Sequence, residues 1–304
     1  MPVTVLLLAA LGAPSNLQPV EDFGTNPGAL AMHAYVPKAT PPGAPLVVAL
    51  HGCLQPADDY AQKSGWLALA DELGFALLVP GQVKANNPAG CFSWFEPTDI
   101  QRGQGEASSI RQMVEYMVKT HRLDRARVFV TGLSAGGAMA TAMLAAYPDV
   151  FSGGAIIAGL PYRCAEGLAD ARRCMGDPGA ISPGHWGQRV RAASDHKGPW
   201  PTVQIWHGAA DPIVSPANAE ALAVQWQSVH GVAAAPEART GKNTKRRQWR
   251  KGSRPVIEMV LVDEMGHGVP LAPNCGTAGD YLLDVGVCST RQIAEFWGLA
   301  PQPK

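Results

Sequence analysis

Short apolar runs alternate with helical patterns along most of this 304-residue chain, and that alternation limits the possible folds more than any other feature. Continuous apolar runs of this length are typical of parallel strands that are buried on both faces of a sheet. The alternation therefore predicts a single, doubly wound α/β domain with helices on both faces. The runs cover residues 46–50, 76–79, 128–130, 155–157, 203–206 and 256–262.

Several segments between these runs carry helix signals. Apolar residues from Ile110 to Val118 recur at helical spacing. Ser215-Pro216 is a cap and first-turn pair, and it predicts a helix that ends near Gly231. Ser289 to Gln292 is a capping-box pattern, which predicts a C-terminal helix opened by the Ser289 side chain.

Composition excludes several classes of protein. Lys and Arg number 25, Asp and Glu also number 25, and 46% of residues are hydrophobic, so the chain is globular rather than disordered. A neutral chain is a poor nucleic-acid binder, and no apolar run reaches the roughly 20 residues that span a bilayer. We expect no nucleic-acid partner and no membrane span. The basic run Lys242–Lys251 could be a polyanion site, but a solvated hairpin of residues 244–251 and 256–262 is the favoured interpretation.

The N-terminus and the cysteines indicate export. An apolar run from Val3 to Leu11 precedes Gly12-Ala13, so residues 1–14 are predicted to be a signal-peptide remnant; an N-terminal strand or a wrongly assigned start are the alternatives. Six cysteines without a Cys-x2-Cys pair favour disulfides over a zinc site, although about 15 pairings remain open. The expected location is secreted or periplasmic.

One motif predicts a nucleophilic serine. Gly132-Leu133-Ser134-Ala135-Gly136 follows the apolar run 128–130 and precedes a helical segment, which is the strand–turn–helix setting of a nucleophile elbow. Glycines flank the nucleophile because Cβ atoms there would collide with the strand or the helix. Ser134 is thus the predicted nucleophile, and the Ala135 N–H is a predicted oxyanion donor.

A serine nucleophile needs a base, and chain order selects it. In folds with this elbow the order is serine, acid, histidine, so the base must lie well downstream of Ser134. His267, inside Gly266-His267-Gly268 after the last run, is the predicted base. His207 ends an earlier run and is interpreted as structural.

Asp211 is the predicted acid. It follows the run 203–206 in a loop where a carboxylate can accept the Nδ1–H of His267. Asp263 and Glu264 are too near His267 in sequence for this role. Asp211-Pro212 also favours a turn, and both roles are compatible.

A second oxyanion donor is expected after the first strong run. In His51-Gly52-Cys53 a glycine-containing turn can direct a backbone N–H at the developing oxyanion. Cys53 is the predicted donor, with Leu54 as the alternative.

These motifs, taken together, resemble the polyhydroxybutyrate depolymerase-type esterases, which have the α/β-hydrolase fold and are related to feruloyl and acetylxylan esterases. The resemblance runs from about Phe23 to Leu299. It rests on the elbow and on residues 23–28, 50–53, 91–95, 206–211, 265–268, 284–286, 289–291 and 296–299.

The resemblance implies specific roles. It makes Ser134, Asp211 and His267 the catalytic triad and places Cys53 beside the oxyanion hole. It implies the disulfides Cys53–Cys91, Cys164–Cys174 and Cys275–Cys288. Trp94 and Trp206 become candidates to line the substrate pocket, with ordinary core packing as the equal alternative.

The expected protein is a serine carboxylesterase. Residues 15–304 would form one catalytic domain that hydrolyses polyhydroxybutyrate-type polyesters or their oligomers, as a monomer and without metal or organic cofactor. Family members often carry a separate substrate-binding module; because the chain ends at Lys304, soluble oligomers, amorphous polymer or small esters are expected rather than crystalline polymer. The alternatives are a feruloyl, acetylxylan or other small-ester esterase, including one for aromatic polyesters, and a non-catalytic binding protein on the same scaffold.

Overall fold

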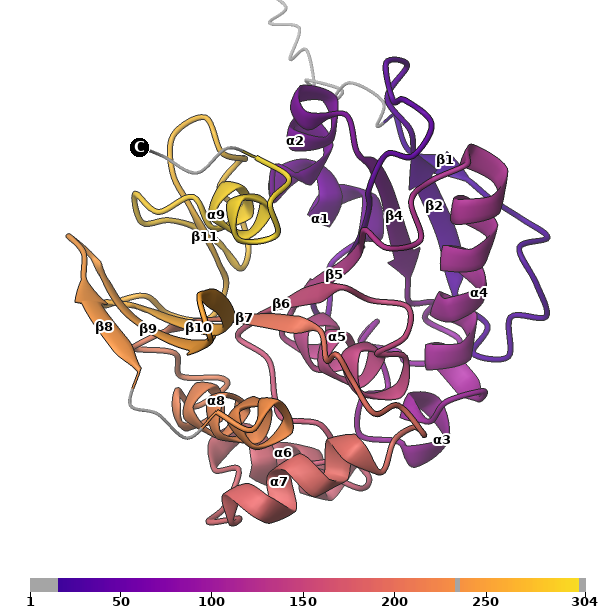
Figure 1. Cartoon of the computed structure of the whole chain (residues 1–304). Helices are drawn as coiled ribbons and strands as arrows, with labels where there is room; N and C mark the ends of the chain where they lie inside the picture. The colour runs from indigo at the N-terminus through magenta and orange to yellow at the C-terminus, as the bar shows by residue number, and fades with distance from the viewer. Residues whose placement is uncertain (1–15, 233–235, 301–304) are drawn as a thin grey trace, which may run out of the picture.

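A large, mostly parallel sheet runs through the protein, as the computed structural model of residues 16–232 and 236–300 shows (Figure 1). The central strands β4-β3-β5-β6-β7-β10 are parallel, whereas β1-β2 and β9-β8 add antiparallel edges. The α/β-hydrolase fold is thereby confirmed; the predicted signal remnant, residues 1–14, lies outside the described residues. The strands of this sheet are β1 (Gln18–Pro19), β2 (Ala31–Tyr35), β3 (Leu46–Leu50), β4 (Ala76–Gly81), β5 (Val128–Leu133), β6 (Gly153–Ile157), β7 (Thr202–Gly208), β8 (Glu237–Thr240), β9 (Thr244–Lys251) and β10 (Arg254–Val262).

Helices cover both faces of the sheet, so alternate residues of each central strand enter different cores. In β3, Val48 packs in the core under α4, α5 and α8, and Val47 packs in the core under α1, α2 and α9. Strands buried on both faces must be apolar throughout, which is why the central strands appear as continuous apolar runs in the sequence. The helices are α1 (Ala57–Lys63), α2 (Trp66–Leu73), α3 (Pro97–Ile100), α4 (Gly105–His121), α5 (Ala135–Ala146), α6 (Leu168–Gly176), α7 (Pro183–Arg191), α8 (Ala217–His230) and α9 (Ser289–Phe296).

The basic run forms strand β9 of an antiparallel hairpin with β10, as the hairpin interpretation predicts. Four of its cations meet acidic partners on neighbouring elements, so much of the positive charge is neutralised within the fold. The pairs are Lys245–Asp263, Arg246–Glu258, Arg247–Glu220 and Arg250–Glu237.

The capping box predicted at α9 is wrong. Cys288 is the N-cap residue, and the Ser289 Oγ donates to the carbonyl of Pro270 at 2.8 Å. Thr290 Oγ1 likewise donates to the carbonyl of Ser64 at 2.7 Å. Both hydroxyls therefore fasten the helix to backbone carbonyls distant in the sequence instead of capping it, a tertiary effect that local sequence does not encode.

A small parallel pair, β11 (Val269–Leu271) and β12 (Leu282–Asp284), follows β10 and forms a separate two-stranded sheet. None of the helices described in residues 16–232 and 236–300 is both long and apolar enough to cross a membrane.

Candidate active site

Ser134 sits in a strained turn between β5 and α5. Its backbone has φ 56° and ψ −117°, a conformation that non-glycine residues adopt at a cost of about 1–3 kcal/mol. A Cβ on Gly132 would lie 2.3 Å from the carbonyl oxygen of Gly136, and a Cβ on Gly136 would lie 2.3 Å from that of Leu50. The two glycines of the motif are thus required by close backbone approaches, as the elbow interpretation predicts.

The helix that follows Ser134 begins beside the predicted oxyanion site. Ala135 is the first residue of α5, and the first intrahelical bond that closes this turn is donated by the Ala138 N–H to the Ser134 carbonyl at 2.9 Å. The N–H of Ala135 precedes that bond, so it belongs to the group of helix N-terminal donors that α5 itself does not use. All twelve residues of α5 are buried, which fixes this donor rigidly against the sheet.

Asp211 and His267 are brought together from the loops after β7 and β10. The Nδ1 of His267 lies 2.7 Å from Oδ2 of Asp211, and both residues are buried. Oδ1 of Asp211 accepts the N–H groups of Ile213 and Val214 at 2.8 and 2.9 Å. Since the carboxylate holds a proton on Nδ1, it leaves Nε2 of His267 as the basic nitrogen.

His207 adds a second imidazole to this carboxylate. Its Nε2 donates to the carbonyl of Val214 at 2.8 Å and lies 3.4 Å from Oδ2 of Asp211. Burial alone would raise the pKa of Asp211, but the hydrogen bonds from His207 and His267 outweigh it and hold that pKa well below its usual range. Asp211 is therefore ionised at neutral pH, and the structural role expected for His207 takes the form of a contact with the Asp211 carboxylate.

The loop after β3 settles which of the two expected residues has a free N–H. Leu54 donates its N–H to the carbonyl of Ala89 at 2.8 Å, so this donor is occupied. Within the described part of the chain the Cys53 N–H has no acceptor. Cys53 is thus the better candidate for the oxyanion donor.

All three cystine bridges connect the pairs that the resemblance implies: Cys53–Cys91, Cys164–Cys174 and Cys275–Cys288. The first bridge joins the oxyanion loop to the loop that carries Trp94. The second lies in the segment between β6 and β7 and shares a buried cluster with Trp94 and Ala135.

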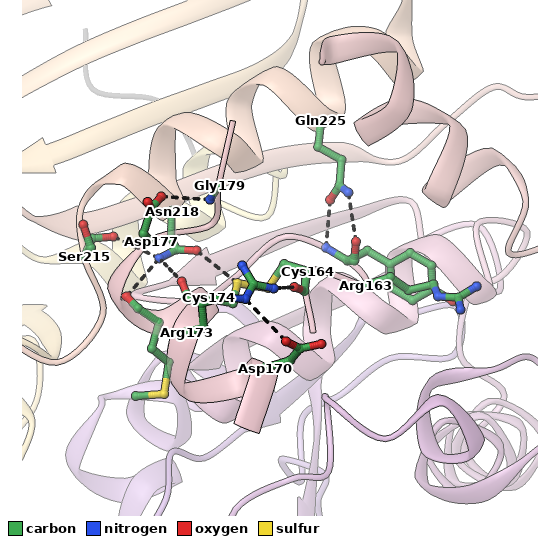
Figure 2. Close-up of a disulfide and its surroundings, with 12 residues drawn as sticks. Arg163, Cys164, Asp170, Arg173, Cys174, Asp177, Gly179, Ser215, Asn218 and Gln225 are labelled. Carbon is green, nitrogen blue, oxygen red and sulfur yellow. Dashed lines mark hydrogen bonds and ion pairs between the residues drawn. A yellow bond between two sulfur atoms is a disulfide. The ribbon is translucent and has the colours of Figure 1, made fainter. Parts of the chain in front are cut away.

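Helix α8 fastens that segment with two buried amides (Figure 2). Asn218 Nδ2 donates to the carbonyls of Cys174 and Met175 at 3.0 and 3.2 Å. Gln225 Oε1 accepts the N–H of Tyr162 at 2.9 Å, and its Nε2 donates to the carbonyl of Tyr162 at 3.1 Å. The segment between β6 and β7 is therefore held in place by hydrogen bonds from α8 side chains to its backbone as well as by a disulfide.

The two tryptophans differ in their surroundings. Trp94 is 7% exposed and belongs to the cluster that includes Ala135, so its place is consistent with a pocket wall. The expectation for Trp206 is corrected: its indole is fully buried within β7, donates to Gln204 Oε1 at 2.9 Å and packs under the Arg246 guanidinium. Side chains along β7 alternate between the two faces of the sheet, and that of Trp206 lies on the face covered by α1, α2 and α9.

Exposed apolar side chains gather in the segments that build the site. In the described ranges 16–232 and 236–300 the large hydrophobic side chains left exposed are Leu54, Leu168 and Ile213, at 71%, 57% and 40%. Leu54 follows Cys53, and Ile213 donates its N–H to Asp211. Leu168 follows Gly167, whose N–H binds the carbonyl of Phe95 at 2.8 Å. Exposed apolar groups near a reactive centre favour apolar ligands.

Sequence reasoning missed three residues that support the site. His51 Nδ1 donates to the Gly52 carbonyl at 2.8 Å, and its Nε2 accepts the Gln82 N–H at 3.0 Å. Burial lowers the pKa of His51, so the imidazole is neutral in this arrangement. Glu106 accepts from Gln82 beneath the same loops. His51-Gly52 was visible in the sequence, but nothing there marks Gln82 or Glu106 as neighbours of it.

Among the described residues there is no group of three or more His, Cys, Asp or Glu side chains that could hold a metal ion. The chemistry that the geometry supports is nucleophilic catalysis by serine with a histidine base and backbone oxyanion donors.

Comparison with known proteins identifies the family of the chain. The family model described as "Esterase PHB depolymerase" matches residues 30–249. Poly(3-hydroxyalkanoate) depolymerase C of Paucimonas lemoignei is 44% identical over 97% of this chain and 73% of its own length. Acetylxylan esterase A of Aspergillus oryzae is 33% identical over 84% of this chain and 85% of its length.

The solved structures add support for the fold. Acetyl xylan esterase from Aspergillus awamori superimposes with a TM-score of 0.80 at 26% identity and covers 93% of this chain and 99% of its own. The match to the family model spans more than half of the chain, and the depolymerase of P. lemoignei is similar over almost all of it. The chain therefore belongs to the esterase PHB depolymerase family and is a carboxylic ester hydrolase of the α/β-hydrolase fold.

Proposed function

We propose that this protein hydrolyses the ester bonds of poly(3-hydroxyalkanoate) polyesters or their oligomers through an acyl-enzyme on Ser134. The observation that carries the proposal is the buried Asp211–His267 pair on the same edge of the sheet as the strained Ser134 elbow. A buried carboxylate that fixes one imidazole tautomer has little purpose in a non-catalytic scaffold, and a rigid elbow adds the nucleophile.

The first half-reaction acylates the serine. Nε2 of His267 takes the hydroxyl proton as Ser134 Oγ attacks the ester carbonyl, and Asp211 stabilises the imidazolium that forms. The N–H groups of Cys53 and Ala135 bind the oxyanion of the tetrahedral intermediate. The C–O bond to the alcohol then breaks, and the imidazolium returns the proton to the leaving alkoxide.

The second half-reaction repeats this sequence with water. His267 removes a proton from water, which attacks the acyl-enzyme, and the same backbone donors hold the second oxyanion. Collapse releases the acid, returns the proton to Ser134 Oγ and restores the free enzyme. The protein's own residues supply every proton transfer.

Identity and surface chemistry favour a polyester over a sugar ester. The 44% identity to the P. lemoignei depolymerase exceeds the 33–34% to the acetylxylan and feruloyl esterases. Leu54 and Ile213, which flank the candidate donor and the acid, are apolar and exposed. Sugar recognition requires polar groups in such places, whereas an aliphatic polyester presents methyl and methylene groups.

An acetylxylan or feruloyl esterase is the second candidate. The TM-score of 0.80 with the A. awamori acetyl xylan esterase supports it, because that similarity covers 93% of this chain. The same triad would serve both functions, so the two candidates differ only in the acyl and alcohol groups that the site accepts.

The deciding experiment measures release of 3-hydroxybutyrate from amorphous polyhydroxybutyrate and of acetate from acetylated xylan, with Ser134→Ala as the blank. The proposal expects release of 3-hydroxybutyrate that is absent in the blank. Release of acetate alone would transfer the function to the second candidate. A Ser134 that fails to react with an organophosphonate in a folded protein would leave a non-catalytic binding protein.

The proposal extends to organisation and location. Residues 15–304 act as one catalytic domain, the protein is a monomer, and it works in the secreted or periplasmic space, where its three disulfides are stable. Light scattering after size exclusion tests the monomer, and hydrolysis by a chain of residues 15–304 alone tests the single catalytic domain. Recovery of the protein from the periplasm or the medium tests the third, and N-terminal sequencing of that material tests removal of the signal segment, which an intact Met1 would contradict.

A further inference from the structure

Glu106 is a buried carboxylate that the mechanism above does not use. It lies in the first turn of α4, is 2% exposed, and has no cationic partner among the described residues. Burial, with Asp99 nearby, raises the pKa of Glu106 to about 7. Buried carboxylates are costly unless they are paired, so a role for this one must lie in its hydrogen bonds.

The backbone around Glu106 is closed against water. A Cβ on Gly28 would lie 2.4 Å from the Cα of Glu106, so the N-terminal segment packs directly on the first turn of α4. Gly28 also donates its N–H to Ser109 Oγ at 2.8 Å, which fastens that segment in place. The Glu106 side chain is thereby confined to the space between the helix and the loops next to the site.

The two carboxylate oxygens bind two different loops. Oε1 accepts from Gln82 Nε2 at 2.6 Å, in the loop after β4. Oε2 accepts the N–H of Ser93 at 2.9 Å, in the loop that carries Trp94. Gln82 Nε2 also donates to the carbonyl of Cys91 at 3.0 Å, so the two loops are joined through Glu106 and Gln82.

The first connection to the site runs through His51. The Gln82 N–H binds Nε2 of His51, which places the ring proton on Nδ1, and Nδ1 donates to the Gly52 carbonyl. The Gly52 carbonyl and the Cys53 N–H belong to one planar trans peptide and point in opposite directions. Holding that carbonyl therefore sets the direction of the Cys53 N–H.

The second connection runs through the disulfide. Cys91 is bonded to Cys53, with their Cα atoms 4.3 Å apart. Glu106 reaches this cystine through the Ser93 N–H and, by way of Gln82, through the Cys91 carbonyl. The backbone of Cys53 is thus positioned by His51 and its side chain by the disulfide to Cys91. Glu106 is linked by hydrogen bonds to both of these contacts.

We propose that Glu106 is a positioning residue that holds the Cys53 N–H in its oxyanion-binding direction through Gln82, His51 and the Cys53–Cys91 cystine. The inference rests on the proposed function, because it assigns Cys53 as an oxyanion donor. An oxyanion donor stabilises charge that develops only in the transition state. Displacement of the Cys53 N–H should therefore lower kcat and leave binding of the substrate in its ground state unchanged.

The test uses Glu106→Gln in the full chain and a soluble short-chain 4-nitrophenyl ester, at about pH 8.5, where the Glu106 carboxyl, with its pKa of about 7, is ionised and accepts through both oxygens. An amide cannot accept from both Gln82 and Ser93, because one of its two positions is itself a donor. Loss of a whole oxyanion donor typically costs 100- to 1,000-fold in kcat, so a displaced donor should cost roughly 10- to 100-fold, with KM within about twofold of wild type. Affinity for a trifluoromethyl ketone, which forms the tetrahedral oxyanion, should fall by the same factor.

Glu115→Gln is the matched control. Glu115 lies on the same helix but is partly exposed and pairs with Arg111 and Arg125, so its change should leave kcat unaltered. Gln82→Met removes the side-chain donor and keeps the backbone N–H that binds His51, and it supplies a second variant if Glu106→Gln does not fold. If Glu106 and Gln82 act in one network, kcat of the variant that combines Glu106→Gln with Gln82→Met should fall by less than the product of the two single fold-losses.

Three results would overturn the proposal: wild-type kcat in folded Glu106→Gln, a loss that appears only in KM, or multiplicative losses in the double variant. Each leaves the triad assignment standing. Failure of the proposed function has a separate signature, since Ser134→Ala would then keep its ester hydrolysis whatever Glu106→Gln does.

Discussion

The carboxylate of Asp211 binds His267 through one oxygen, at 2.7 Å, and the backbone of its own turn through the other. The turn tendency of Asp211-Pro212 and the role of Asp211 as the acid partner are thus two functions of one side chain. His207, also buried, contacts the oxygen that His267 uses. The imidazole of His267, the proposed base, is consequently held by a carboxylate that is itself fixed by contacts to both of its oxygens.

Asp211→Asn should inactivate the enzyme without unfolding it. The amide oxygen of Asn can still accept from Ile213 and Val214, so the turn survives. Its NH2 group would face Nδ1 of His267 and favour the tautomer with the proton on Nε2, which is no longer a base. We expect kcat to fall roughly 10⁴-fold. The measurement is ester hydrolysis beside near-UV circular dichroism; a folded variant with more than a tenth of wild-type kcat would contradict this role.

Gly136→Ala should disrupt the elbow, whereas a glycine at the same helical position elsewhere tolerates the change. A Cβ at Gly136 would lie 2.3 and 2.4 Å from the carbonyl oxygens of Leu50 and His51, so the oxyanion loop must move. Gly184, also the second residue of its helix, has open space around its Cβ position. We expect Gly136→Ala to lose soluble expression or most activity and Gly184→Ala to retain both.

Ser134→Gly should be more stable than Ser134→Ala. Glycine adopts φ 56° and ψ −117° without the Cβ strain, which outweighs the greater entropy of the unfolded glycine variant. The expected difference in the free energy of unfolding is about 1 kcal/mol, measured by urea denaturation with the disulfides intact. Both variants should be inactive, and equal stabilities would show that the elbow stores no strain at this residue.

The sequence was sufficient for the central sheet and the elbow because their signals are local. Strands such as β3 and β5 are apolar throughout, and the glycines around Ser134 are fixed by steric contacts within and beside the motif. The order of serine, acid and histidine then limited Asp211 and His267 to the loops after the later strands. The structure places both residues there.

What the sequence did not predict depends on distant contacts. Trp206 occupies a strand position next to the site in sequence, but the pleat turns its indole to the other face. Ser289 has a capping pattern, but its hydroxyl donates to the carbonyl of Pro270 in β11. Glu106 resembles an ordinary first-turn acid of a helix, but Gly28 and the loop around Ser93, both distant in the sequence, pack against it.

Glu106 also gives the folded protein a dependence on pH. Burial raises its folded-state pKa from 4.5 to about 7, so between these values the folded state binds a proton that the unfolded state does not. Stability from this group therefore increases as pH falls from about 7 toward 4.5, and above pH 7 the buried charge costs about 3 kcal/mol relative to the protonated form. Gln82 and Ser93 donate to it and Asp99 faces it, and these contacts are included in the shift.

The stability of Glu106→Gln relative to wild type should consequently change with pH. The amide carries no charge at any pH, so the variant escapes the cost that wild type bears above pH 7. We expect the difference in the free energy of unfolding, variant minus wild type, to rise by about 2–3 kcal/mol between pH 5 and pH 8. Urea denaturation at both pH values measures it, with Glu115→Gln as the control that should show no such rise. A difference that stays constant would mean that Glu106 titrates near its ordinary pKa, with the carboxylate solvated rather than enclosed by Gly28.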